Sequence, residues 1–185
     1  MKYLFYFMAL IAPACAIAGD VVSADVEYRD ERYFVAIESV VNADPEKIYD
    51  LLTDFNHLTK LNPDIKESHV IFSLDENTHR THIVTDSCIT FYCKKITLQQ
   101  DVEELGRGII VTTVVPDKSD FVYGHARWKI EDNGNHTTRI YYSNDMKPKF
   151  FVPPLIGPLL IKDKLREEVL ATINGLERLA EQNPE

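Results

Sequence analysis

The stretch PPLIGPLLIKDKLREEVLATINGLERLAEQ, residues 153–182, decides the fold that the sequence predicts. Its apolar side chains recur mostly at steps of three and four residues, which places them on one stripe of a long helix. They are Leu155, Leu159, Leu165, Val169, Ile173, Leu176 and Ala180. Because residues 32–147 have mainly the pattern of strands, we expect this helix to bury its stripe against a sheet.

The strand pattern begins at residues 31–41, which are rich in β-branched and aromatic side chains. Asp44 and Pro45 then favour the start of a helix with Ile48, Leu51, Leu52 and Phe55 on one face, followed by a short helix or turn at 56–61. Further strands are predicted at 66–74, 79–88, 93–104, 108–115, 121–131 and 137–146. Their connections are too short for parallel crossovers, so they predict an antiparallel meander, with a hairpin signal at Asn133-Gly134.

The N-terminal residues 1–18 have the features of a secretory signal peptide. Lys2 precedes an apolar run, and Ala16-Ile17-Ala18 is a small-x-small cleavage signal. A second possible cut follows Ala24, and an N-terminal membrane anchor is the alternative, although the apolar run is shorter than the about 20 residues that span a bilayer. We therefore expect a periplasmic protein with an acidic segment at 19–30, either a loose leader or an edge strand, and one domain at 31–182.

The composition limits the partners of this domain. The 185-residue chain has a net charge of −9, which disfavours nucleic acid and anionic surfaces as electrostatic partners. Export would leave Cys88 and Cys93 as an even pair in an oxidising compartment. On one straight strand their sulfurs would lie about 16 Å apart, so a disulfide requires a hairpin loop at residues 89–92. Two reduced buried thiols or a redox pair are the alternatives.

The order of these elements, β-α-α-β6-α, resembles the START-like helix-grip (SRPBCC) superfamily, in particular its polyketide cyclase/dehydrase and coenzyme Q-binding START-type branch. The resemblance is carried by the sequences VNADPEKIYDLLTDF at 41–55, ARWKI at 126–130 and TRIYY at 138–142, together with the terminal helix. It implies an α+β helix-grip fold, in which a curved antiparallel sheet wraps around one long C-terminal helix. It also implies a cavity for a hydrophobic or amphipathic small molecule such as a lipid, a quinone or a polyketide-like compound, and no cofactor.

Side-chain alternation along the strands predicts which residues face this cavity. Trp128 and Ile130 are taken to face inward, which gives Ile140, Tyr142 and Asn144 the same direction on the next strand. The full set of predicted cavity residues is Val84, Asp86, Leu98, Gln100, Trp128, Ile140, Tyr142, Asn144, Leu165 and Val169. Buried polar groups among them should bond each other or a ligand, because an unpaired one costs several kcal/mol.

A different function would need other features. His82 and Asp86 are the candidates for an acid–base pair in a cyclase or dehydratase, but the sequence has none of the usual catalytic motifs. No metal site is predicted, because His79 and His82 would face opposite sides of a strand. Phe150, Phe151, Leu155 and Ile156 are predicted to form the cavity mouth, where transient contact with a membrane surface is possible, helped by Lys147 and Lys149. An envelope protein-interaction module is the third alternative, favoured if this apolar segment were exposed and the interior filled.

Overall fold

The computed structural model describes residues 20–89, 92–152 and 157–182. The predicted signal peptide at 1–18, Leu155 and Ile156 lie outside these residues. The elements in chain order are β1 (Asp20–Arg29), β2 (Arg32–Val41), α1 (Pro45–Thr53), the 3-10 helix η1 (Leu58–Lys60), β3 (Ile65–Ser73), β4 (Thr78–Ile89), β5 (Tyr92–Gly106), β6 (Ile109–Val114), the 3-10 helix η2 (Pro116–Lys118), β7 (Phe121–Gly134), β8 (Thr137–Pro148) and α2 (Gly157–Gln182). None of the helices in the described part of the chain is long and apolar enough to cross a membrane.

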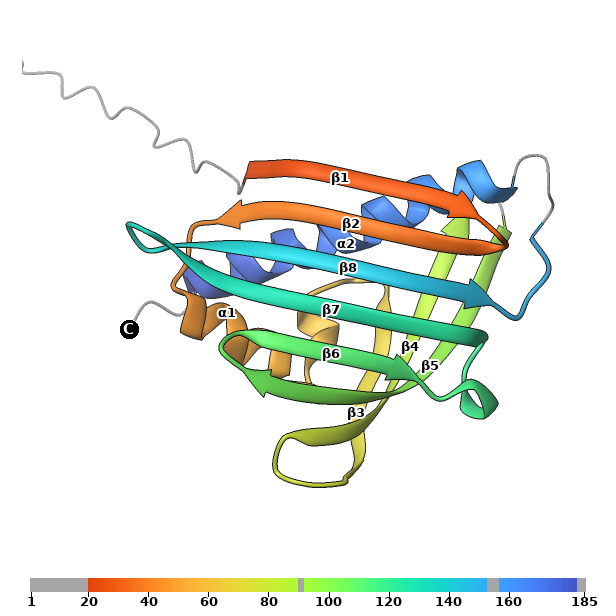
Figure 1. Ribbon diagram of the computed structural model, residues 1–185, viewed down its shortest axis with the longest axis horizontal. Coiled ribbons are helices and arrows are strands. Elements are labelled where there is room, and N and C mark those ends of the chain that lie inside the picture. Colours follow the sequence, from red (N-terminus) through yellow and green to blue (C-terminus); the bar gives the residue numbers. More distant parts are fainter. Residues whose placement is uncertain (1–19, 90–91, 153–156, 183–185) are drawn as a thin grey trace, which may run out of the picture.

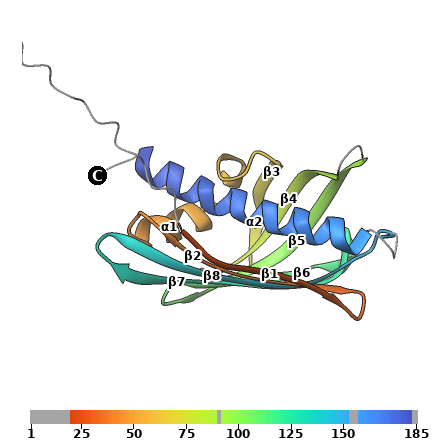
Figure 2. The same ribbon diagram turned by 90° about the horizontal axis from the view of Figure 1, so that it is seen from above.

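The strands form one antiparallel sheet in the order β1-β2-β8-β7-β6-β5-β4-β3. The meander from β3 to β8 agrees with the prediction, and β8 returns to pair with β2. The sheet is curved, and α2 lies along its concave side (Figures 1 and 2). This arrangement confirms the α+β helix-grip fold, since one long helix is held by one curved sheet.

The segment that the sequence left open as a leader or an edge strand is β1. It pairs along β2, from Asp20 opposite Val40 to Arg29 opposite Arg32. The sheet therefore begins at Asp20, eleven residues before the domain start predicted at Glu31. The mostly exposed side chains of β1 explain why its sequence lacks a clear alternating pattern.

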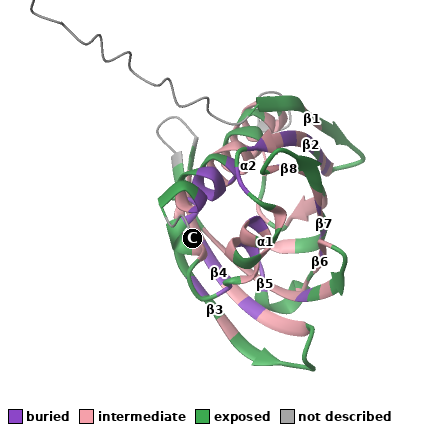
Figure 3. Cartoon of the chain, turned by 90° about the vertical axis from the view of Figure 1, so that its left-hand side faces the viewer, coloured by how far each residue is buried: buried purple, intermediate pink, exposed green. Residues whose placement is uncertain are grey.

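The core lies where α2 and α1 meet the sheet (Figure 3). Ile173, Leu176 and Ala180 of α2 are buried there, as the predicted stripe requires. Leu165 and Val169 pack against this core in partly buried positions. The prediction was wrong for Leu159, which is 63% exposed because the first turns of α2 lie beyond the buried core.

Two hairpins of the meander can be compared with their predicted positions. A disulfide joins Cys88 to Cys93 across the β4–β5 hairpin, which confirms the predicted pairing. At the β7–β8 hairpin the turn lies two residues later than Asn133-Gly134 predicts. Its central residues are Asn135 and His136, both with positive φ, and Gly134 pairs with Thr137. The register shift between Asp132 and Gly134 supplies the extra residue that moves the turn.

Candidate functional site: a cavity between the sheet and the helices

The concave face of the sheet and the helices enclose two adjoining chambers. The α1 chamber has a volume of about 210 Å³ and is lined by residues of the α1–β3 region and of the sheet: Leu52, Phe55, Leu58, Leu61, Ile65, Ile83, Leu98, Gln100, Val102, Ile110, Thr112, Val114, Phe121, Gly124, His125, Ala126, Trp128, Tyr142, Asn144, Met146 and Thr172. The α2 chamber has a volume of about 300 Å³ and is lined by Tyr33, Val35, Asn62, Ile65, Ile83, Thr85, Ser87, Lys94, Ile96, Leu98, Phe121, Trp128, Tyr142, Met146, Pro148, Phe150, Ile161, Lys164, Leu165, Glu168, Val169 and Thr172. Because Trp128, Tyr142 and Leu98 line both, the chambers are parts of one mainly apolar cavity.

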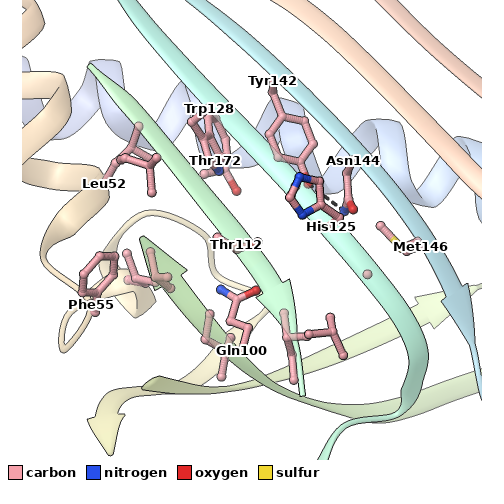
Figure 4. Close-up of a pocket in the computed structure, with 18 of the residues that line it drawn as sticks. Leu52, Phe55, Gln100, Thr112, His125, Trp128, Tyr142, Asn144, Met146 and Thr172 are labelled. Atoms are coloured by element: carbon pink, nitrogen blue, oxygen red, sulfur yellow. Dashed lines mark hydrogen bonds between the residues drawn. The ribbon is translucent and has the colours of Figure 1, made fainter. Parts of the chain in front are cut away.

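The polar side chains of the α1 chamber come from strands β5 to β8 and, in the case of Thr172, from α2 (Figure 4). The Asn144 Nδ2 donates a hydrogen bond of 2.9 Å to the Tyr142 hydroxyl, and the Tyr142 ring lies 4.3 Å from that of Trp128. Burial raises the pKa of Tyr142 to about 12, so this hydroxyl is neutral at physiological pH. A hydroxyl that accepts one bond still has its own proton to donate, so Tyr142 can offer a hydrogen bond to a bound molecule.

Two charged residues of the α2 chamber, Lys164 and Glu168, belong to an ion-pair cluster on its helix side. The Lys164 Nζ lies 2.8 Å from an Asp64 oxygen and 3.4 Å from a Glu168 oxygen. The Asn62 side chain donates to the Glu168 backbone carbonyl at 3.1 Å. Burial raises the pKa of Glu168, an effect that the nearby ammonium of Lys164 partly opposes. Burial alone lowers the pKa of Lys164, but the carboxylates around it raise that pKa overall. Lys164 and Glu168 are therefore paired within the protein, Lys94 is a further cation of the lining, and much of the remaining surface is apolar.

Most of the predicted cavity residues lie on its walls. Leu98, Gln100, Trp128, Tyr142, Asn144, Leu165 and Val169 line one or both chambers. Ile140 shares the inward face of β8 but is fully buried in the core beside them. Val84 and Asp86, together with the acid–base candidate His82, line neither chamber.

The direction predicted for β4 was wrong. Ile83 lies directly opposite Leu98 in the β4–β5 register, and residues opposite each other point to the same face of a sheet. The cavity residues of β4 are therefore Ile83, Thr85 and Ser87. His82 instead packs its ring 5.1 Å from that of His69. Residues 82 and 86 also lie about 13 Å apart along one strand, too far for an acid–base pair.

Sequence reasoning missed several lining residues outside the meander. Tyr33 and Val35 come from β2, where buried and less buried residues alternate in the structure. The sequence does not show this alternation, because Phe34 and Ala36 on the other face are apolar too. Leu52 of α1 and Phe55 just after it belong to the predicted apolar face, which was not included among the predicted cavity residues. Thr172 lies on α2 between the predicted residues and carried no signal, because a threonine on a helix is usually exposed.

The predicted mouth is described in part. Phe150 lines the α2 chamber, whereas its neighbour Phe151 is 82% exposed. Lys147 and Lys149, which were predicted to help membrane contact, each have a partner within the protein. Lys147 pairs with the Glu31 carboxylate, and Lys149 donates to the carbonyl of Pro116. The lysine near this end of the cavity is Lys94, whose Nζ lies 5.2 Å from the centre of the Phe150 ring.

Within residues 20–89, 92–152 and 157–182, no three His, Cys, Asp or Glu side chains are grouped so that they could hold a metal ion. The lining of the cavity combines apolar surface and neutral hydrogen-bonding groups with one internally paired ionic cluster and the ammonium group of Lys94.

Solved structures show the same fold. A START superfamily protein from Mycobacterium smegmatis has 22% identity and a TM-score of 0.67, with 80% of this chain and 97% of that chain covered. The Zhui aromatase/cyclase from Streptomyces sp. R1128 has 12% identity and a TM-score of 0.67, with coverages of 82% and 94%. A STAR-related lipid transfer protein from Xanthomonas axonopodis has 13% identity and a TM-score of 0.61, with coverages of 86% and 99%. A comparison with curated proteins finds no significant match.

The family assignment comes from the sequence itself. The model of the family described as polyketide cyclase/dehydrase and lipid transport matches residues 41–171, which run from the end of β2 into α2. This segment contains all the residues that line the α1 chamber except Thr172, and most of those that line the α2 chamber. The chain therefore belongs to the polyketide cyclase/dehydrase and lipid transport family.

Proposed function

We propose that this protein binds or transports one hydrophobic or amphipathic small molecule, such as a lipid, a quinone or a polyketide-like compound, in the cavity between α2 and the sheet. The observation that carries the proposal is the pair of adjoining chambers of about 210 and 300 Å³. Their lining is mainly apolar; of its charged groups, Lys164 and Glu168 are paired with each other, and Lys94 lies near the Phe150 ring. An unfilled interior of this kind favours a binding protein over a module that acts only through its surface.

The expected affinity is modest. Burial of roughly 300 Å² of apolar ligand surface contributes about 7 kcal/mol at the usual value per unit area. Association itself costs about 4 kcal/mol or more in lost translational and rotational freedom. Such a balance suits a carrier, which must also release its ligand.

We further propose that the protein works in the periplasm after removal of residues 1–18. The leader-like sequence supports this location. The Cys88–Cys93 disulfide also supports it, because disulfides persist mainly in oxidising compartments. Phe150 lines one end of the cavity, and the nearby Phe151 and Leu159 are strongly exposed. These two side chains would make transient contact with a membrane during ligand exchange.

Native mass spectrometry tests the proposal. The protein is purified without detergent from the envelope of its own cells, and organic extraction follows the measurement. We expect a stoichiometric bound molecule, identifiable in the extract. Leu98→Trp, which fills space shared by both chambers, should abolish the bound mass. The matched control is Lys95→Trp, at an exposed position of the same strand that lines neither chamber. A clean unliganded mass for the wild type, with no uptake from added membranes, would rule out the carrier.

A further inference from the structure

Lys94 is a cation in the lining of the α2 chamber, and it has no ion-pair or hydrogen-bond partner among the described residues. The residue is partly exposed, and its Nζ lies 5.2 Å from the centre of the Phe150 ring. Attraction to an aromatic face holds the ammonium in place, but it leaves the N–H groups of the ammonium free to donate hydrogen bonds. Lys94 therefore keeps charged donors available at the end of the cavity that Phe150 lines.

The other lysine of this lining makes a useful contrast. The Lys164 Nζ lies 2.8 Å from an Asp64 oxygen and 3.4 Å from a Glu168 oxygen. Glu168 also accepts a hydrogen bond of 3.4 Å from the Ser87 hydroxyl. The charges of this cluster are thus satisfied by one another. Among the charged residues that line the chamber, Lys94 is the one whose charge no described side chain compensates.

Hydroxyl groups lie beside Lys94 on the same face of the sheet. Ser87 is directly opposite Lys94 in the β4–β5 register, and Thr85 is opposite Ile96, the next inward residue of β5. All of them line the α2 chamber. The Thr85 hydroxyl has no hydrogen-bond partner within the described ranges, and it is not one of the unpaired oxygens that are fully buried. Its oxygen therefore keeps accessible surface and can serve a bound molecule.

Resting on the proposed function, we propose that Lys94 binds an anionic headgroup of the ligand, so that the cavity takes an amphiphile with a carboxylate or phosphate at one end of an apolar chain. The ammonium donates to the headgroup, and the Thr85 hydroxyl is a second donor nearby. The apolar chain lies along Ile96 and Leu98. Because Leu98 lines both chambers, the chain can extend from the α2 chamber into the α1 chamber.

The other charges of the chamber determine at which end the anion binds. Beside Lys164 the headgroup would meet the carboxylates of Asp64 and Glu168 in a largely apolar setting, where repulsion is poorly screened. Beside Lys94 it meets an uncompensated cation and neutral hydroxyls. The net charge of −9 on the whole chain opposes anions only weakly, because salt screens exposed charges beyond about 8 Å. The contact with Lys94 is direct and escapes this screening.

The test compares decanoate, decyl phosphate and 1-decanol by isothermal titration calorimetry. These probes share one alkyl chain and differ in the headgroup, and the two anions distinguish a carboxylate from a phosphate. Lys94→Met should weaken binding of at least one anion about tenfold, the usual value of a hydrogen bond to a charged group, and leave binding of 1-decanol unchanged. Lys94→Arg should keep the preference for the anion. The matched control is Lys95→Met, which makes the same charge change at an exposed neighbouring position that lines neither chamber, and it should alter none of the affinities.

Several results would overturn the headgroup site. An equal loss of affinity for 1-decanol would mean that Lys94 acts by packing its alkyl stem. An equal loss in Lys95→Met would mean that the overall charge matters and a direct contact does not. A Tm of ligand-free Lys94→Met below that of Lys95→Met would mean that the ammonium has a partner within the protein. Binding of 1-decanol without a preference for either anion would refute the headgroup site and leave the proposed function standing, whereas binding of none of the probes by the wild type would overturn both.

Discussion

The packing of α2 against the α1–β3 connection predicts that Gly175→Ala destabilises the protein. A Cβ at Gly175 would lie 1.8 Å from the carbonyl oxygen of Leu61 and 2.7 Å from its carbonyl carbon. Since ordinary contacts between carbon atoms are about 3.5 Å or longer, the helix or the connection must move by more than about 1 Å. The obstacle is backbone, which cannot change rotamer to make room.

The magnitude follows from two opposing effects. Replacing a glycine by alanine inside an exposed helix normally stabilises it by about 1 kcal/mol. Overpacking a tight contact costs about 1–3 kcal/mol, and a clash with backbone belongs at the upper end of this range. We therefore expect a net loss of about 1–2 kcal/mol in the free energy of unfolding. Because Leu61 lines the α1 chamber, ligand affinity should fall as well.

Urea unfolding monitored by circular dichroism measures this change. Asn174→Ala is the matched control, because Asn174 is exposed on the same turn of α2 and should show only the small gain in helix propensity. A Gly175→Ala protein as stable as the wild type, or more stable, would refute the reasoning. It would mean that α2 can move away from Leu61 without loss of packing.

Three further predictions concern the cavity and the β4–β5 hairpin. Burial raises the pKa of Glu168, so the folded state holds this proton more tightly than the unfolded state does. The resulting contribution to stability is complete below the ordinary carboxyl pKa and is lost as the pH rises through the raised pKa. Glu168→Gln should therefore flatten the profile of Tm against pH between pH 4 and 7, and an unchanged slope would contradict the shift. Reducing the Cys88–Cys93 disulfide, which closes a loop with a sequence separation of 5, should cost about 2 kcal/mol in urea unfolding; no difference with and without dithiothreitol would show that the bond does not constrain the unfolded chain. Tyr142→Phe removes the acceptor of the Asn144 amide and should lower stability by about 1 kcal/mol, whereas a more stable variant would argue against that hydrogen bond.

Local sequence patterns were sufficient for the secondary structure. Each predicted strand of the meander agrees with the structure within a few residues, because alternation and turn residues act over short distances. The inward faces of β7 and β8 were also predicted, since Trp128 and Tyr142 mark them with large apolar rings. Both lie on the cavity wall as expected.

The face of β4 was mispredicted although the information was present. Both of its faces mix polar and apolar side chains, so alternation alone does not decide between His82 and Ile83. The predicted Cys88–Cys93 pair decides it, because placing these cysteines opposite each other also places Ile83 opposite Leu98. The pairing of two strands thus determines which face of β4 points into the cavity, which the pattern of β4 alone does not.

The elements, their order and the disulfide could be predicted from the sequence, because each depends on side chains that are neighbours along the chain or on one strand pair. The helix-grip class followed from the resemblance of this order and its motifs to a known superfamily. The separation between α2 and the sheet is known only from the tertiary structure. The cavity is a space left between α2 and the curved sheet, and its size depends on their separation, which no local pattern records. The exposure of Leu159 and the ion pair of Lys147 with Glu31 likewise depend on segments that are distant along the chain and are placed only by the folded structure.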